Sequence, residues 1–201
     1  MKKNKLIDLC LSYESLAVEL RRKFHAQPEL RWCETRTLEI ISDYIRPLNI
    51  PAESCTVSEW RGGIVIDVYF DPDFNRLLFR ADIDALPVHE ETGLNFASQN
   101  TGVSHACGHD FHIAGLLTFL QLLADGKLAP KHNLRLVFQR AEENPGGDPI
   151  PESGGHSLVN SGVLGNIIAE IFFYNFFKSL TISRIIIYFH QALPADTDDI
   201  F

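Results

Sequence analysis

The segment Leu134-Arg135-Leu136-Val137-Phe138 is a short, largely apolar run that follows residues 111–124, a stretch rich in Leu and Ala. The first is predicted to be a buried strand and the second a helix, which should stop at Asp125-Gly126. Upstream, residues 64–70 and 76–80 are β-branched or aromatic runs typical of strands. Helices that alternate with apolar strands predict an α/β domain with a partly parallel sheet.

An amphipathic helix, a second helix and a hairpin are expected in the first half of the chain. Apolar residues recur at three- and four-residue spacing at Leu6, Leu9, Tyr13, Leu16, Leu20 and Phe24, and again at Leu38, Ile41, Ile45 and Leu48, close to Pro47. Asp71-Pro72-Asp73 separates the strands 64–70 and 76–80, so these two strands are expected to pair as a hairpin.

Polar residues gather at the predicted ends of these elements. They are Asp82 and Asp84 after one strand, Glu142 and Glu143 after another, and Cys107 and His109 before the helix that begins near Phe111. In open α/β sheets, sites form beyond the carboxyl ends of strands, where helices also begin. We therefore expect all three clusters to meet at one edge of the sheet.

Cys107 and His109 belong to a Gly-containing turn, His105-Ala106-Cys107-Gly108-His109-Asp110-Phe111-His112. A thiolate and an imidazole two residues apart can point at the same metal ion, and a helix N-terminus favours the charged sulfur. Glu143 would complete three protein ligands. Sulfur, nitrogen and oxygen donors together accept Mn, Zn, Co or Ni, so the sequence predicts a divalent metal without fixing which one.

Glu142 would face a different direction from Glu143 and act as a general base. A bound ion lowers the pKa of its water from about 15.7 to about 7, and Glu142 would take the proton and return it to the leaving amine. A neighbouring carboxylate commonly orients a ligating imidazole, a role that Asp84, Asp82 or Asp110 could fill. These residues together predict metal-assisted hydrolysis of an amide.

Each residue taken alone has a simpler interpretation. A lone cysteine is most often a small buried hydrophobe, and isolated glutamates are usually solvated. A hydrolase that uses Cys107 as nucleophile, with His109 or His112 as its base, is another alternative. It leaves the adjacent Glu142 and Glu143 unexplained, so the metal site is favoured.

The composition argues against several classes of protein. The net charge of −8 and the pI near 5.4 argue against nucleic-acid binding. Four scattered cysteines without a CxxC pair favour a reducing compartment. The basic N-terminus leads into an amphipathic stretch rather than an apolar one, so a cytoplasmic protein is expected. Lys178 and Arg184 interrupt the apolar residues 171–189, so no membrane span is expected either.

Several segments, in order, resemble the signature motifs of the M20 metallopeptidase family. They are residues 22–35, Arg80-Ala81-Asp82-Ile83-Asp84-Ala85-Leu86-Pro87, the turn 105–112 and Phe138-Gln139-Arg140-Ala141-Glu142-Glu143, and the match covers roughly residues 12–165. The resemblance is greatest to the amidohydrolase branch, which contains hippurate hydrolases, N-acyl amino acid and N-acetyl-diaminopimelate deacylases, and auxin-conjugate hydrolases.

The resemblance implies an aminopeptidase-like (Zn-peptidase) α/β catalytic domain with a site for two metal ions. Position by position, it makes Cys107, His109 and Glu143 metal ligands and Glu142 the catalytic acid/base. It also implies a small-molecule substrate, an N-acyl amino acid, whose amide bond is cleaved.

The resemblance fails toward the C-terminus. Family members continue after a segment like Gly162-Val163-Leu164 into a strand that ends in a ligand histidine, but residues 169–175 contain none, and His190 comes some fifteen residues too late. We therefore expect residues 1–165 to be the N-terminal part of the catalytic domain and residues 166–201 to be an aberrant apolar tail. The lid or dimerisation domain and the returning C-terminal segment are expected to be absent, which leaves the oligomeric state open. A catalytically inactive, truncated remnant of such an enzyme is the alternative.

Overall fold

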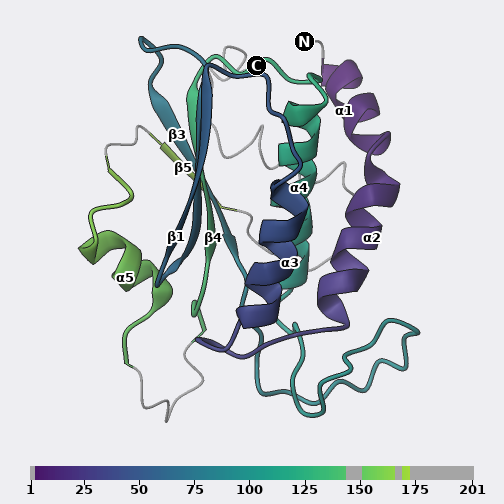
Figure 1. Cartoon of the computed structure of the whole chain (residues 1–201). Coiled ribbons are helices and arrows are strands. Elements are labelled where there is room, and N and C mark those ends of the chain that lie inside the picture. The colour runs from purple at the N-terminus through teal and green to yellow at the C-terminus, as the bar shows by residue number, and fades with distance from the viewer. Residues whose placement is uncertain (1–2, 144–150, 166–168, 173–201) are drawn as a thin grey trace.

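The computed structural model of the chain describes residues 3–143, 151–165 and 169–172. Within them, one sheet has the strand order β1-β2-β4-β3-β5 (Figure 1). Its strands are β1 (Ser54–Trp60), β2 (Gly63–Tyr69), β3 (Arg76–Asp82), β4 (Asn133–Gln139) and β5 (Ala169–Phe172). β2 pairs antiparallel with β1 and β4, whereas β3 pairs parallel with β4 and β5. The predicted partly parallel sheet is confirmed.

Helices cover both faces of this sheet. They are α1 (Lys3–Leu11), α2 (Glu14–His25), α3 (Thr35–Ile45), α4 (His109–Ala124) and α5 (Gly154–Asn160). In Figure 1, α3 and α4 lie on one face of the sheet with α2 beside them, and α5 lies on the opposite face. In the described part of the chain, every helix is too short or too polar to cross a membrane.

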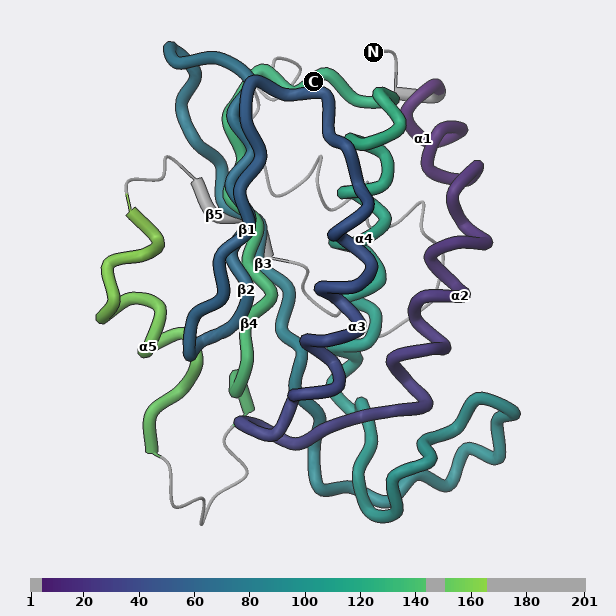
Figure 2. The backbone as a smooth tube through the Cα atoms, in the orientation of Figure 1, coloured from purple at the N-terminus to yellow at the C-terminus, as the bar shows by residue number. Residues whose placement is uncertain are grey.

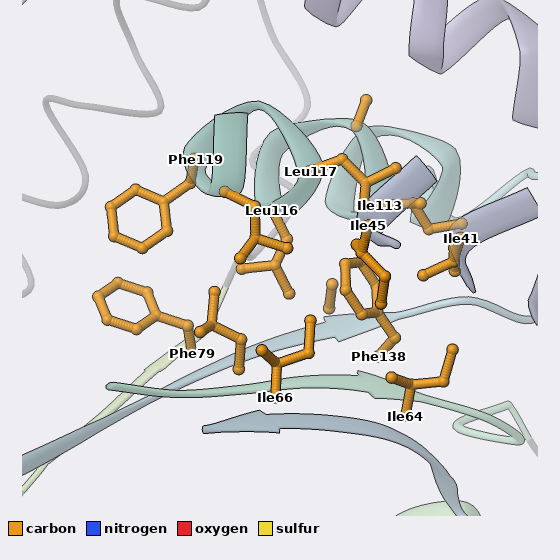
Figure 3. Packing of buried hydrophobic residues seen from close by; sticks show 14 of the residues in the cluster. Ile41, Ile45, Ile64, Ile66, Phe79, Ile113, Leu116, Leu117, Phe119 and Phe138 are labelled. Atoms are coloured by element: carbon orange, nitrogen blue, oxygen red, sulfur yellow. The ribbon is translucent and has the colours of Figure 1, made fainter. Parts of the chain in front are cut away.

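The main core lies between the sheet and the helices α3 and α4 (Figure 3). Alternate side chains along the strands point toward the helices, so Ile66, Phe79 and Phe138 meet Leu116 of α4. Phe79 and Phe119 stack with ring centroids 5.0 Å apart. Burial of each such side chain contributes about 1.5–3 kcal/mol, so this layer fixes α4 firmly against the sheet.

The other face of the sheet is buried as well. Val65, Leu78 and Val137 point away from α4 and pack with Leu158 of α5. The central strands β2, β4 and β3 are therefore covered on both sides. This explains why their sequences are nearly continuous apolar runs rather than alternating ones.

The N-terminal amphipathic pattern forms two helices rather than the single one predicted. α1 ends at Leu11 and α2 begins at Glu14. The hydroxyl of Ser12 donates a hydrogen bond to the carbonyl of Leu9 at 2.6 Å, and such side-chain bonds compete with the helical ladder. The other predicted helices and the strand around 134–138 are confirmed as α3, α4 and β4.

The predicted hairpin between residues 64–70 and 76–80 is wrong. β4 lies between β2 and β3, and β2 instead forms its hairpin with β1. The reason is Asn133 at the start of β4, whose side chain holds the connection between β2 and β3. Its Oδ1 accepts from the Phe70 N–H at 2.8 Å, and its Nδ2 donates to the carbonyls of Asp71 at 2.8 Å and Phe74 at 2.9 Å. These bonds guide the chain across the end of β4.

The sheet also reaches into the segment that the sequence analysis assigned to an aberrant tail. Residues 169–172 form β5, which pairs parallel with β3. The remainder of that segment, including His190, lies outside the described residues.

The parallel strands β3 and β4 end at the same edge of the sheet. Asp82, the last residue of β3, lies opposite Gln139, the last residue of β4. The long loop that leaves β3 at this edge returns to begin α4 at His109, as the tube in Figure 2 shows. All three polar clusters therefore start from one edge of the sheet.

Gly63 is expected to tolerate no side chain, because it begins β2 against β4. Its φ is +138°, and a Cβ there would lie 1.9 Å from the carbonyl oxygen of Phe138. We expect Gly63→Ala to lower the free energy of unfolding by at least about 2 kcal/mol, the range of strained backbone with added overlap. Urea denaturation measures the change.

The matched control for this prediction is Gly126→Ala. Gly126 also has a positive φ, +62°, but no described atom lies within 4 Å of its added Cβ. The free energy of unfolding of this variant should fall by only about 1 kcal/mol, the cost of a left-handed backbone alone. Equal losses in the two variants would contradict the close approach of β2 and β4.

Candidate metal centre

His109 is the centre of the polar cluster at the sheet edge. It is the first residue of α4 and follows Gly108, whose φ of 77° turns the chain into the helix. Its Nδ1 lies 2.8 Å from the carbonyl oxygen of Asp84 and 3.2 Å from the Asp84 Oδ1. Because Nδ1 faces two acceptors, it carries the proton, and Nε2 is the nitrogen that can bind a cation.

Both glutamates of the predicted site lie on the Nε2 side of His109. The His109 Nε2 is 3.8 Å from the Glu142 Oε2 and 3.7 Å from the Glu143 Oε1. The Glu143 side chain is 17% exposed and that of Glu142 is 40% exposed. The adjacent glutamates therefore differ in environment: Glu143 is turned into the protein, whereas Glu142 remains open to a substrate.

Cys107 joins this group through Glu143. The pKa of its thiol is raised to about 12, first by burial, then by a hydrogen bond to Glu143, and by the negative charges of Glu143, Glu142 and Asp84. The ligand atoms that lie within 4.8 Å of one another are those of His109, Glu142 and Glu143, and Cys107 adjoins this group through its contact with Glu143. A cation among them would reverse the local charge and favour the thiolate.

The charge balance of the cluster fits a divalent cation. Four carboxylates lie around the imidazole of His109, from Asp82, Asp84, Glu142 and Glu143. Burial lowers the pKa of His109, but the hydrogen bond to Asp84 and the charges of Asp82, Asp84 and Glu143 outweigh it and raise this pKa to about 9. Burial, and then the charge of Asp82, raise the pKa of Glu142. Such surplus negative charge, together with sulfur, nitrogen and oxygen donors, is the chemistry of a transition-metal site.

A second group of metal-binding residue types shares His109 and is formed with Asp82 and His112. The His112 Nδ1 is 3.5 Å from the Asp82 Oδ2, and the rings of His109 and His112 stack with centroids 5.1 Å apart. However, the Arg80 Nη1 lies 2.8 Å from the Asp82 Oδ1. Because this guanidinium neutralises Asp82, the group with Glu142 and Glu143 is the better place for a cation.

The two carboxylates predicted to orient ligands differ in what they contact. Asp84 contacts His109 directly, and its Oδ2 accepts a hydrogen bond from the Glu143 N–H at 2.8 Å. Asp110 is fully buried and binds the His25 Nδ1 at 2.8 Å and the Arg21 Nε at 3.1 Å. Asp84 therefore supports two ligands, whereas Asp110 fastens the first turn of α4 to α2.

One residue of this region, Glu34, was given no role from the sequence, although it lies in the segment 22–35 that resembles a family motif. Its buried carboxylate binds the backbone just before Glu142. Residue spacing does not reveal this contact, because a side chain meets a backbone group 107 positions away.

Comparison with known proteins identifies the family of the chain. Residues 78–177 match the sequence model of peptidase family M20/M25/M40. The N-acetyldiaminopimelate deacetylase of Listeria monocytogenes serotype 4a (strain HCC23) is 44% identical over 137 residues, which are 68% of this chain and 36% of the relative. That of Priestia megaterium (strain ATCC 12872 / QMB1551) is 41% identical over 134 residues, 67% of this chain and 35% of the relative. The chain thus spans little more than a third of the length of these relatives.

Solved structures share the fold. A putative aminohydrolase from methicillin-resistant Staphylococcus aureus has a TM-score of 0.73 at 34% identity, over 85% of this chain and 41% of that one. A dinuclear metal-binding peptidase of the M20 family from Bacillus subtilis has a TM-score of 0.69 at 30% identity, over 82% and 44%. The sheet, its covering helices and the donor set at its edge define an α/β domain of the metallopeptidase class. The chain belongs to peptidase family M20/M25/M40, which confirms the family predicted from its motifs.

The contact between α2 and α4 predicts a pH-dependent stability. The hydrogen bond to Asp110 is the largest influence on the pKa of His25 and raises it, burial opposes this, and Glu90 raises it further. A raised folded-state pKa stabilises the fold below the unfolded value of about 6.5, and this contribution is lost as pH rises through the folded value. We therefore expect the stability advantage of the wild type over His25→Gln to shrink between about pH 6 and about pH 9.

Urea denaturation of chelator-treated protein at the two pH values measures this advantage. His89→Gln, at an exposed position, is the matched control and should follow the wild type at both. An advantage that grows with pH would contradict the assigned ion pair.

Proposed function

We propose that this chain carries the metal-binding part of an amidohydrolase site, which removes the acyl group from an N-acyl amino acid. The supporting observation is that the His109 Nε2 faces Glu142 and Glu143 at one edge of the sheet, with the Cys107 thiol hydrogen-bonded to Glu143. The deacetylase relatives suggest N-acetyldiaminopimelate as a substrate. Because the chain covers 36% of the first of these relatives, the activity of the whole protein is part of the proposal.

Cys107, His109 and Glu143 would hold the cation, and Asp84 would keep the Nε2 of His109 turned toward it. When bound there, a divalent cation would polarise the amide carbonyl and lower the pKa of a water from about 15.7 to about 7. Mn, Zn, Co and Ni are all compatible with these donors. A second ion, as in the dinuclear relative, would require donors beyond this set of three.

Glu142 would move the proton. Its carboxylate is partly exposed and lies next to the His109 Nε2, so it can reach a water positioned there. It would accept the proton of the attacking water at Oε2 and deliver it to the nitrogen of the leaving amino acid. The raised pKa of Glu142, caused first by burial, suits a group that must both take and release a proton near neutral pH.

We also propose a cytoplasmic location. The four cysteines are free thiols, and those of Cys33 and Cys55 are exposed. Exposed free thiols persist most readily in a reducing compartment.

Substitution of the two adjacent glutamates should have different effects on catalysis and on metal binding. Glu142→Gln is expected to lower kcat for N-acetyl amino acids about 10²–10⁴-fold, the usual contribution of general acid–base catalysis, while the metal content stays that of the wild type. Glu143→Gln should instead weaken metal affinity by more than about 10-fold. Steady-state kinetics and metal analysis measure both, with the exposed Glu53→Gln as control. A Glu142→Gln variant that loses its metal would contradict the separate roles.

Metal should protect Cys107 from alkylation. In a Cys33→Ala/Cys55→Ala background, the metal-free Cys107 should react slowly with iodoacetamide, because its raised pKa leaves little thiolate. We expect Zn²⁺ or Mn²⁺ to slow this reaction further, because a ligating sulfur is not free to react. Chelation should restore the reaction and abolish turnover. Mass spectrometry of the alkylated peptide and an assay of N-acetyl and N-benzoyl amino acids measure both effects.

Two other outcomes of this experiment would overturn the proposal. Turnover that survives chelation and ends on alkylation would indicate a thiol hydrolase. Metal binding without turnover of any substrate would indicate an inactive member of the family.

A further inference from the structure

We propose that Glu34 is a positioning residue, which fixes the backbone that carries Glu142 and Glu143. The proposal rests on the function proposed above, since that function gives the two glutamates their roles. Glu34 directly precedes α3, whereas Glu142 and Glu143 follow β4.

Both carboxylate oxygens of Glu34 are bound to the two residues just before Glu142. Its Oε1 accepts a hydrogen bond from the Ala141 N–H at 2.8 Å, and its Oε2 accepts one from the Arg140 Nε at 2.9 Å. The Glu34 side chain is 0% exposed. A buried carboxylate that accepts from two donors forms strong, directional bonds, so it defines where these donors lie.

The residue held in this way has a strained backbone. Ala141 has a φ of 49°, in the left-handed region that residues other than Gly rarely adopt. Its N–H is bound by Glu34, and its carbonyl accepts a hydrogen bond from the Gly154 N–H at 3.1 Å. Such a conformation persists only where the surroundings impose it. The consequence is a fixed turn after β4, which determines where the next residue, Glu142, can point.

A second buried carboxylate holds the other side of Glu142. Asp84 accepts the hydrogen bond of the Glu143 N–H at 2.8 Å and is 1% exposed. The N–H groups on either side of Glu142 are thus bound by carboxylates from two different elements of the fold. Asp84 also contacts His109, so its substitution would disturb a ligand directly. Glu34 is the member of this pair that can be changed without touching the donor set.

Glu34→Gln is the variant that breaks this contact while preserving its shape. Both partners of Glu34 are donors, so an amide can satisfy one of them only and must turn its own NH₂ toward the other. We expect kcat and metal affinity to fall about 10–100-fold, the usual effect of losing a group that supports a ligand, with KM unchanged. The Ala141 amide should exchange its hydrogen faster than in the wild type.

Relief of the strain at Ala141 should rescue the variant. Gly adopts the left-handed conformation at little cost, so Glu34→Gln/Ala141→Gly is expected to recover most of the metal affinity that Glu34→Gln loses. Glu39→Gln is the matched control on the neighbouring helix, because Glu39 pairs only with the exposed Arg36 among the interactions of the described residues. It should leave kcat, metal affinity and amide exchange unchanged.

Titration with Mn²⁺ or Zn²⁺, hydrogen exchange of residues 140–143 and steady-state kinetics provide the readouts. A Glu34→Gln variant that is less stable to urea, yet binds metal and exchanges its 141 amide as the wild type does, would make Glu34 merely structural and overturn the inference. If Glu34→Gln does not fold, slow exchange of the 141 and 143 amides in the wild type supports the proposal, and fast exchange overturns it.

The failure of this inference is distinct from the failure of the proposed function. If the wild-type chain binds no metal, the proposed function is contradicted. The hydrogen exchange of the Ala141 amide still tests the role of Glu34 in that case. If the wild type binds metal and the Glu34→Gln variant behaves like it, the role of Glu34 is contradicted while the proposed function stands.

Discussion

The parallel pairing of β3 with β4 is the constraint on which the rest of the structure depends. Its register sets Asp82 opposite Gln139, and the Ile83 N–H extends the ladder by donating to the Gln139 carbonyl at 2.9 Å. Because both strands are buried on both faces, the register cannot slip without exposing apolar side chains. The acids that follow the two strands are therefore forced together. A helix packed on the same strands brings its first residue, His109, to the same edge.

Placing these acidic side chains close together is electrostatically unfavourable, and directed hydrogen bonds and an ion pair offset part of this repulsion. Carboxylates at close range repel one another, and each would prefer to be protonated or neutralised. Asp84 uses its oxygens on His109 and the Glu143 N–H, and the Arg80 guanidinium neutralises Asp82. Glu142 and Glu143 keep their charges facing the His109 Nε2. The structure thus directs its remaining negative charge to one point, which is where a cation would lower the free energy most.

The sequence predicted which residues gather at this edge better than it predicted the order of the strands. Strand ends and a helix start are local features, so the convergence of Cys107, His109 and the glutamates could be foreseen from the rule for open sheets. The pairing of β2 with β4 could not be foreseen in this way. The Asn133 side chain holds the connection between β2 and β3, and such a contact leaves no periodic signal in the sequence. β1 was missed since all seven of its residues are exposed, which removes the alternation that marks a strand. Glu34 was missed because a contact between a side chain and a distant backbone N–H follows no spacing rule.

The surroundings of Cys107 also argue against the thiol hydrolase that the sequence allowed as an alternative. A nucleophilic cysteine needs a lowered pKa, which an imidazolium or a helix N-terminus beside it can supply. Here burial and three neighbouring acids raise the pKa of the thiol to about 12, and Glu143 accepts its hydrogen bond. This environment suppresses the free thiolate that a nucleophile requires. It is suited to a sulfur that loses its proton only when a cation arrives, because the same acids that hold the proton would then share the cation.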